Sequence, residues 1–192
     1  KIDSDILYDN MMNKFVWGNI KDPKVNIDYF HDNNIGVMKY RSTFFRLADQ
    51  LQQEGKYEQA AAVLDKSLEE LPLYQIPADG TLTFYAQLYY MLDKKESARH
   101  LVNELTRNNI QMLKYINSLS PKFANTPSIR QNEEMSLNIL QKLMQITYQH
   151  GDKELAMDIS QQVEKLLNPG LLRPSRPVMP ENDSAQTIEL EN

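Results

Sequence analysis

Two stripes of apolar residues, each with the spacing of a helix face, lie between Arg41 and Tyr74. The first stripe ends at Gly55 and is made of Phe44, Leu47, Ala48 and Leu51. The second ends at Pro72 and is made of Tyr57, Ala60, Leu64 and Leu68. Residues three or four positions apart share one face of a helix, so both stripes predict amphipathic helices. Because glycine readily takes the left-handed conformation that closes a helix, the pattern predicts a helix–turn–helix pair.

This pair of about 34 residues resembles a tetratricopeptide repeat. Two weaker copies follow when Asp93 and Gly151 are aligned with Gly55, at offsets of 38 residues (55 to 93) and 58 residues (93 to 151). The signature positions are then Leu82, Tyr85, Ala86, Tyr89, Ala98 and Val102 in the second copy, and Leu140, Leu143, Met144, Ala156 and Val163 in the third. The expected fold is all-α. It is a right-handed, tetratricopeptide-like helical-hairpin solenoid of about three helix pairs, close to the minimum for a stable stack.

Three regions follow from this pattern: an N-terminal helix and loop cap over residues 1–34, a repeat domain over residues 35–169, and a Pro-rich extended tail over residues 170–192. A short helix capped by Asp3 or Ser4 is expected over residues 3–15. The loop after it is expected to hold one extended stretch, at residues 25–30. Between the second and third copies, residues 109–119 predict an extra helix and residues 120–131, with two prolines, predict a loop. Asp93 and Glu96 have the spacing of a reciprocal capping box.

Composition argues against several classes of function. The net charge is −5, the pI is about 5.3 and no basic patch stands out, which argues against nucleic acid as a partner. The absence of cysteine excludes disulfides and thiolate metal sites, and it fits cytoplasm and periplasm equally well. No apolar run approaches the roughly 18–20 residues that cross a bilayer, and no signal peptide is visible. Because the chain opens with Lys1 rather than Met, we expect a piece of a longer protein with any targeting signal upstream.

A second resemblance lies in the N-terminal segment YDNMMNKFVWG. This segment is similar to one in an uncharacterised family of large bacterial multi-pass membrane proteins, whose N-terminal half resembles protein O-mannosyltransferases and whose soluble C-terminal part carries helical repeats. The matching residues are Tyr8, Asp9, Asn10, Met12, Asn13, Lys14, Phe15, Trp17 and Gly18. The family often has Arg-Met where this chain has Val37-Met38. The resemblance implies an extracytoplasmic (periplasmic) domain tethered to the inner membrane through a missing N-terminal region, which would hold any transferase chemistry.

In repeats of this type the first helix of each pair lines a concave groove. The expected lining residues are Phe45, Asp49, Gln52 and Gln53 from the first copy, Thr83, Gln87, Tyr90 and Met91 from the second, and Gln141, Gln145, Tyr148 and Gln149 from the third. The set is rich in amides and tyrosines and nearly free of Lys and Arg. It therefore suits a neutral polar ligand, either a peptide backbone or a sugar, rather than a carboxylate. The alternative is a solvated helix face without a ligand.

Other candidate sites are weaker. The N-terminal segment either plugs the open end of the stack through Phe15 and Trp17, which we favour, or forms a contact patch. That patch would consist of Asn10, Asn13, Lys14 and Trp17. The acidic loop residues Asp22, Asp28, His31 and Asp32 fit neither an EF-hand nor a zinc-helix spacing, so no metal site is predicted. No nucleophile motif or phosphate loop is present, so neither catalytic residues nor a cofactor are predicted.

The functional hypothesis that follows is a non-catalytic binding module. It would be the extracytoplasmic part of a larger membrane protein resembling glycosyltransferases, and its partners would be a protein or peptide, possibly a glycan, and the membrane part of the same chain. A free-standing scaffold for extended peptides is the alternative, and an enzyme domain using the acidic loop is the least favoured. Residues 171–180 (LLRPSRPVMP) either lie across this domain or a neighbouring copy, or form a flexible terminus.

Overall fold

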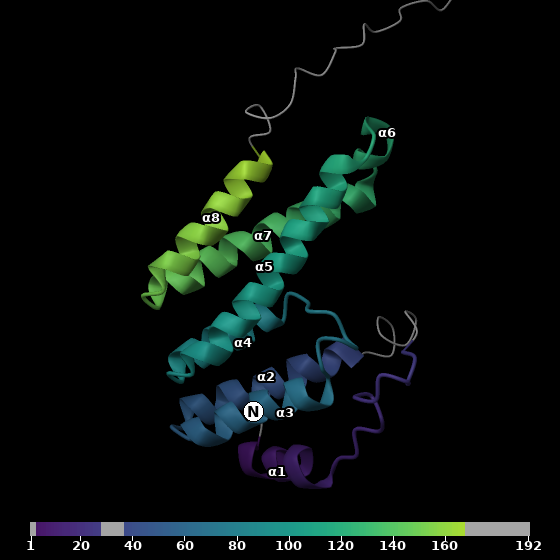
Figure 1. Ribbon diagram of the computed structural model, residues 1–192. Helices are drawn as coiled ribbons and strands as arrows, with labels where there is room; N and C mark the ends of the chain where they lie inside the picture. Colours follow the sequence, from purple (N-terminus) through teal and green to yellow (C-terminus); the bar gives the residue numbers. More distant parts are fainter. Residues whose placement is uncertain (1–2, 28–36, 168–192) are drawn as a thin grey trace, which may run out of the picture.

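The computed structural model describes residues 3–27 and 37–167, and within them all regular secondary structure is helical, with no strands (Figure 1). The first two elements are α1 (Ser4–Asp9) and a π-helical turn, η1 (Asn10–Lys14). The remaining helices are α2 (Val37–Gln53), α3 (Tyr57–Glu70), α4 (Leu82–Met91), α5 (Lys95–Ser118), α6 (Pro121–Ala124), α7 (Pro127–Gln149) and α8 (Lys153–Leu167). The predicted all-α class is therefore confirmed.

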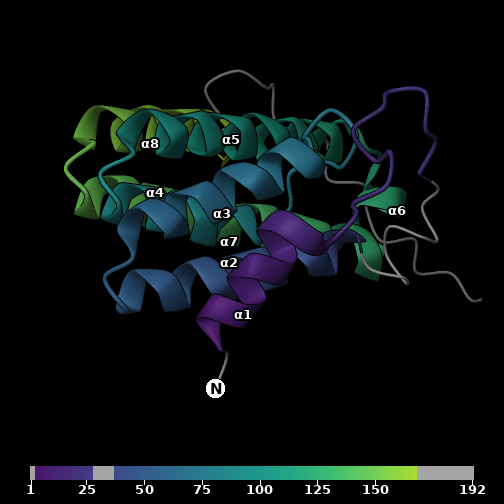
Figure 2. The same ribbon diagram turned by 90° about the horizontal axis from the view of Figure 1, so that it is seen from below.

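Six of these helices form three antiparallel pairs, α2 with α3, α4 with α5, and α7 with α8. The pairs stack on one another along the molecule (Figure 1). The first helices contact each other from pair to pair, α2 against α4 and α4 against α7, while α5 packs against both α7 and α8. Seen from below, α5 and α8 lie in one layer, and α2 and α7 lie in another (Figure 2).

The turns inside the three pairs have the same backbone geometry. Gly55, Asp93 and Gly151 all have a positive φ, of 77°, 58° and 79°. The next residue then donates its backbone N–H to a carbonyl five positions earlier in each turn: Lys56 to Leu51 at 2.9 Å, Lys94 to Tyr89 at 2.8 Å and Asp152 to Thr147 at 2.8 Å. This is the bond that closes a helix on a left-handed residue. The predicted equivalence of the three turns is confirmed, including the turn that lacks glycine.

Three local predictions are wrong. Asp93 and Glu96 form no capping box, because Asp93 is the left-handed residue that ends α4, and Lys94 at the N-cap of α5 has no side-chain capping bond. Residues 109–119 are not a separate helix, since they continue α5 without a break. Residues 120–131 are not a loop, because Pro121 begins α6 and Pro127 begins α7. Proline is favoured at the first position of a helix, where its missing N–H has no partner to lose.

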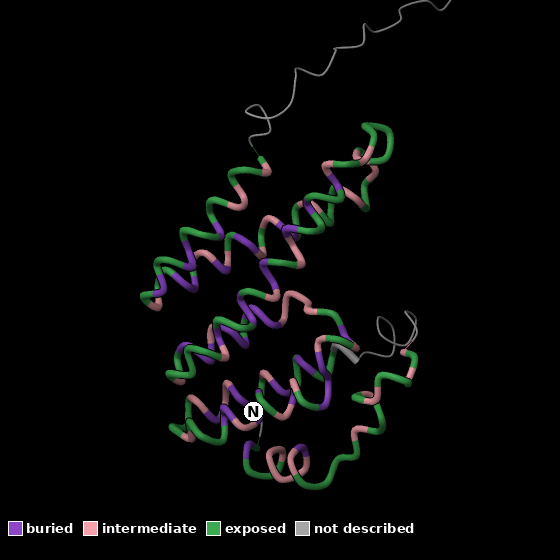
Figure 3. The backbone as a smooth tube through the Cα atoms, viewed as in Figure 1, coloured by how far each residue is buried: buried purple, intermediate pink, exposed green. Residues whose placement is uncertain are grey.

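Buried residues lie on the faces that the helix pairs turn toward one another (Figure 3). Polar groups join the first pair to the second inside this core. The Tyr85 hydroxyl donates to the backbone oxygen of Arg41 at 2.8 Å and lies 2.8 Å from the Ser67 hydroxyl. The Tyr89 hydroxyl donates to Asp65 Oδ1 at 2.6 Å. These bonds satisfy phenols that would otherwise be costly to bury.

The N-terminal segment closes the outer face of α2. The Asp3 side chain accepts a bond from Ile6 N, so its predicted capping role is confirmed. The ring of Trp17 packs 4.8 Å from Phe44 of α2, centroid to centroid, whereas Phe15 stays half exposed. Trp17 therefore covers the end of the stack. Half of the predicted extended stretch (residues 28–30) and the whole predicted tail lie outside the described residues, and residues 25–27 form no strand.

Candidate functional site

An open cavity of about 590 Å³ lies where α4 is too short to fill the space beside its neighbours. Helix α4 has 10 residues, whereas α5 has 24 and α7 has 23. The segment before α4, QIPADG, holds a proline and a glycine, which delay the start of that helix. On the side of α4, the far halves of α5 and α7, which pack against each other, therefore face the loop at residues 77–80 instead of a third helix.

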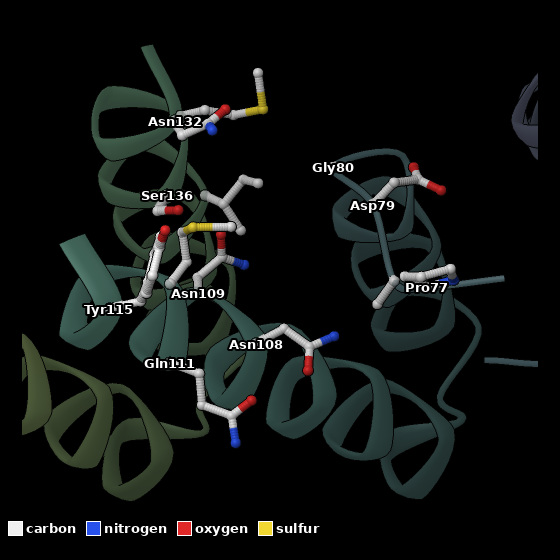
Figure 4. A pocket seen from close by; sticks show the side chains of 13 residues that line it. Pro77, Asp79, Gly80, Asn108, Asn109, Gln111, Tyr115, Asn132 and Ser136 are labelled. Atoms are coloured by element: carbon white, nitrogen blue, oxygen red, sulfur yellow. The ribbon is translucent and has the colours of Figure 1, made fainter. Parts of the chain in front are cut away.

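The walls of this cavity come from three elements. The loop contributes Pro77, Ala78, Asp79 and Gly80. The far half of α5 contributes Asn108, Asn109, Gln111, Met112 and Tyr115, and α7 contributes Asn132, Met135, Ser136 and Ile139. Figure 4 shows Pro77, Asp79 and Gly80 across the cavity from Asn132, Ser136 and Tyr115. Four of these side chains are amides, and the apolar remainder includes two methionines and a partly exposed tyrosine.

A second cavity of about 430 Å³ continues the first along α4 and α7. It shares Gly80, Met135 and Ile139 with the first and is completed by Thr83, Phe84, Gln131, Glu134, Asn138 and Lys142. We call the two cavities together the Met135 groove. Phe84 is 47% exposed, and its ring lies 5.3 Å from that of Phe45 on α2. The Met135 groove thus runs from the tip of the α5–α7 hairpin toward α2.

The loop wall of the Met135 groove is fixed by Arg41, whose side chain is fully buried. Its Nη1 donates to the Pro77 carbonyl and to Asp79 Oδ2, each at 2.7 Å. Its Nη2 donates to the carbonyls of Ile76 at 2.8 Å and Leu71 at 3.2 Å. The other oxygen of Asp79 accepts the backbone N–H of Thr81 at 2.7 Å. One guanidinium therefore holds the whole segment that precedes α4.

The Met135 groove is close to neutral inside. Asp79 is paired with Arg41, so its charge is compensated within the wall. Glu134 and Lys142, both from α7, lie along the second cavity and carry opposite charges. The amide of Asn109 is oriented by its own bond to the Leu105 carbonyl at 2.8 Å. Such a surface offers donors and acceptors beside apolar carbon without selecting a ligand charge.

The residues predicted from the regular repeat are only partly brought together. Phe45, Asp49, Gln52 and Gln87 are half-buried, and Gln141, Gln145 and Tyr148 are exposed. The Asp49 side chain accepts a bond from Gln53 at 2.8 Å. Gln145 and Tyr148 share a separate cavity of about 570 Å³ between α7 and α8, completed by Met144, Gln149, Ala156, Met157 and Ser160. The Lys153 ammonium lies 5.7 Å from the Tyr148 ring centroid in this region.

Tyr90, predicted to line the groove, is packed between the second and third helix pairs. It is buried, and its hydroxyl donates to Asp152 Oδ2 at 2.9 Å. Its ring stacks on His150 with the centroids 5.1 Å apart. Burial, and then the bond to Asp152, raise the pKa of Tyr90 above its usual value. Arg99 Nε lies 3.4 Å from the same carboxylate, so these groups join the second helix pair to the third.

Sequence reasoning missed the residues of the Met135 groove, except for Thr83, which is buried. The signal that could have revealed them was the proline and glycine before α4, which shorten that helix, together with the asparagine pair at 108–109. The predicted groove took the lining positions of a regular repeat in each copy, and a regular repeat leaves no gap beside α4. The Met135 groove is also neutral and rich in amides, but its amides lie on α5 and the first half of α7 and not at the predicted positions.

No group of three His, Asp or Glu side chains that could hold a metal ion occurs in residues 3–27 and 37–167. Three of the acidic loop residues considered from the sequence, Asp28, His31 and Asp32, lie outside that part of the chain. None of the helices in the described ranges is both long and apolar enough to cross a membrane. Comparison with protein-family models, curated proteins and solved structures finds no match to this chain.

Proposed function

We propose that this chain is a non-catalytic binding module of the tetratricopeptide type, and that its Met135 groove takes an extended peptide segment of a partner. The three matching turns at Gly55, Asp93 and Gly151, with the stacking of α2, α4 and α7, support the repeat assignment and a right-handed solenoid. The single observation that carries the binding role is the gap beside the short α4, walled by a loop that a buried arginine holds in place.

The chemistry of the walls favours a peptide over a sugar. Ala78, Met112, Met135 and Ile139 present apolar carbon, which suits side chains of a peptide. Methionine adapts its shape to different partners, and it is common on surfaces that bind varied sequences. The amides of Asn108 and Asn132 can pair with the N–H and C=O groups of an extended backbone.

The lining residues of the Met135 groove include no histidine or cysteine, and their hydroxyl groups are those of Thr83, Tyr115 and Ser136. The Thr83 hydroxyl already donates to the Gly80 carbonyl at 2.8 Å. A nucleophile needs a base within hydrogen-bond reach, and this set offers a hydroxyl without a histidine beside it. Binding is therefore the function that the groove supports best.

The setting that we propose is the extracytoplasmic part of a larger membrane protein resembling glycosyltransferases, where the module positions a protein or glycan near the membrane. The segment from Tyr8 to Gly18 supports this placement. Its test is the hydropathy of the coding sequence upstream of Lys1. Several apolar stretches of about 20 residues would support the placement. A start that encodes none would contradict it, and a free-standing scaffold would take its place.

The binding proposal is tested with peptides selected by panning a phage-displayed dodecapeptide library on the chain. Affinity is then measured by fluorescence polarisation against wild type, Met135→Glu and the matched control Met157→Glu. Both methionines are about equally exposed, at 52% and 62%, so neither substitution should unfold the chain. Fully burying a methionine side chain contributes about 1.5–3 kcal/mol, and Met135, 52% exposed, can gain roughly half of this on binding. Met135→Glu should therefore weaken binding several-fold and Met157→Glu should not.

Two results would contradict the proposal. Failure of the library to yield any peptide with measurable affinity would remove the peptide as ligand, and binding of mannotriose in its place would indicate a sugar site. Loss of peptide binding in Met157→Glu but not in Met135→Glu would move the site to the cavity beside Tyr148.

A further inference from the structure

Two charges of opposite sign lie along the second cavity of the Met135 groove. Glu134 and Lys142 both line this cavity from α7. They are eight residues apart, which corresponds to about 12 Å along a helix axis, and they form no ion pair with each other. Within the described part of the chain neither side chain makes an ion pair or a hydrogen bond with another residue. Both charges can therefore pair with groups of a ligand.

The stretch of α7 between these two charges gives the cavity an apolar wall. Met135 and Ile139 line the cavity from this stretch, and Phe84 lines it from α4. The Phe84 ring is half exposed and is backed by the ring of Phe45, 5.3 Å away. Exposed aromatic rings pack well against aromatic and apolar side chains. The cavity thus offers an apolar surface together with one acidic and one basic group.

Asn138 lies halfway between the two charges on α7. It is four residues from each of them, and residues four apart share one face of a helix. It is exposed and lines the same cavity. Because an asparagine amide has both donors and an acceptor, Asn138 can pair with the N–H and C=O groups of a peptide backbone that runs along α7.

The spacing of the two charges matches an extended peptide. Alternate side chains of an extended chain point to the same side, and each residue adds about 3.3 Å. The side chains at positions i, i+2 and i+4 would therefore all face the groove and span about 13 Å, close to the roughly 12 Å between Glu134 and Lys142. Either chain direction satisfies both charges, so the spacing is fixed and the order is not.

We propose that the Met135 groove recognises peptides that carry a basic and an acidic residue four positions apart, with an apolar residue midway between them. The basic side chain pairs with Glu134, the acidic side chain pairs with Lys142, and the apolar one packs on Phe84. The proposal rests on the proposed function, because it names the class of peptide that the same site takes. Recognition then depends on where the two charges of the peptide lie and not on its net charge.

Panning the dodecapeptide library on single charge reversals tests this motif. Lys142→Glu makes both charged groups of the cavity acidic, so its selected peptides should carry two bases four positions apart. Glu134→Lys makes both basic, and its selected peptides should carry two acids at that spacing. The matched control is Lys95→Glu, which changes the net charge as Lys142→Glu does. Lys95 is exposed and follows the end of α4, whereas the second cavity lies at the start of α4, so the control should select the wild-type motif.

Fluorescence polarisation measures the size of the preference. The acid of a peptide selected on wild type is replaced by lysine, and both peptides are titrated into wild type, Lys142→Glu and Lys95→Glu. Because exposed ion pairs are individually weak, wild type and Lys95→Glu should bind the substituted peptide about fivefold more weakly than the parent. Lys142→Glu should bind it more tightly than the parent, which an unfolded variant could not do. High salt should reduce both preferences, since it screens exposed charges.

The same charge pattern in all four selected pools would overturn the proposal, and so would an unchanged peptide preference in Lys142→Glu. Met135→Glu separates this result from failure of the proposed function. If the selected peptides bind more weakly to Met135→Glu, the groove takes peptides and only the charge motif is refuted. If their affinity does not depend on Met135, or if the library yields no binding peptide, both proposals fail.

Discussion

Replacing Arg41 by methionine should remove the support of the loop before α4 while keeping most of the apolar volume of the side chain. The guanidinium is fully buried and makes four bonds, one to the Asp79 carboxylate and three to backbone carbonyls. Methionine can make none of them. The substitution leaves a carboxylate that is only 15% exposed without its cation. The loop must then either open to water or bury these acceptors unpaired.

The size of the effect follows from these four bonds. Hydrogen bonds to a charged group contribute about 1.5–3 kcal/mol each, or roughly 6–12 kcal/mol for four. Burying the guanidinium costs several kcal/mol, which offsets part of this sum. The difference agrees with the about 3–5 kcal/mol lost when one partner of a buried ion pair is removed. Since a domain is stable by only about 5–15 kcal/mol, Arg41→Met should take a large share of the total.

Urea unfolding followed by circular dichroism at 222 nm measures the loss. The matched control is Arg46→Met, an exposed arginine on the same helix, which should change stability by less than about 0.5 kcal/mol. Panned peptides should also bind Arg41→Met more weakly under conditions where it is still folded, because Pro77 to Gly80 form one wall of the Met135 groove. A loss below about 1 kcal/mol for Arg41→Met would show that Arg41 does not hold this loop.

Three further predictions concern the core, the cap and a turn. Burial, and then the bond to Asp65, raise the pKa of Tyr89. Its contribution to the free energy of unfolding is therefore complete below pH 10 and is lost as pH rises above 10, by up to about 1.4 kcal/mol per pH unit. In a plot of the urea midpoint against pH, Tyr89→Phe should make the fall above pH 10 less steep. Bonds from Ser4, and then from Lys56, lower the pKa of Glu54 to about 2. The contribution of Glu54 to stability is therefore present above pH 4.5 and is lost as pH falls through about 2. In Ser4→Ala, NMR titration should find a higher pKa for Glu54. Asp93→Gly should raise stability by about 0.5–1 kcal/mol. The substitution relieves left-handed backbone strain of roughly 1–2 kcal/mol, and the greater freedom of glycine in the unfolded chain costs about 0.5–1 kcal/mol. A lower urea midpoint for Asp93→Gly would refute this.

The fold was predictable where local chemistry decides it. Glycine is favoured where the backbone φ is positive, so Gly55 and Gly151 identified two of the turns. Alignment of the repeats then placed the third turn at Asp93, which also has a positive φ. Prediction failed where packing or position overrides local preference. Residues 109–119 were predicted to form a separate helix, but Ile110, Leu113 and Ile116 are buried, so tertiary contacts continue α5 through this stretch. Pro121 and Pro127 were interpreted as breakers although each begins a helix.

The site was less predictable than the fold because it depends on unequal helix lengths. The register of a regular repeat placed Tyr90 on an open surface, but Asp152, 62 residues later, accepts its hydroxyl. Nothing in the sequence near Tyr90 shows that contact. The Met135 groove likewise needs α4 to be shorter than α5 and α7, and the two far helix halves to pack together. The neutral, amide-rich lining was predicted for the register positions of a regular repeat, and of those residues only Thr83 lines this groove.

Mapping a panned peptide on the isotope-labelled chain by NMR tests the central claim most directly. If the Met135 groove is the binding site, the largest amide shifts should fall in residues 77–80, 108–115 and 131–139, and the Asn132 and Gln111 side-chain amides should shift with them. Shifts centred on residues 144–160, beside Tyr148 and Met157, would contradict the account.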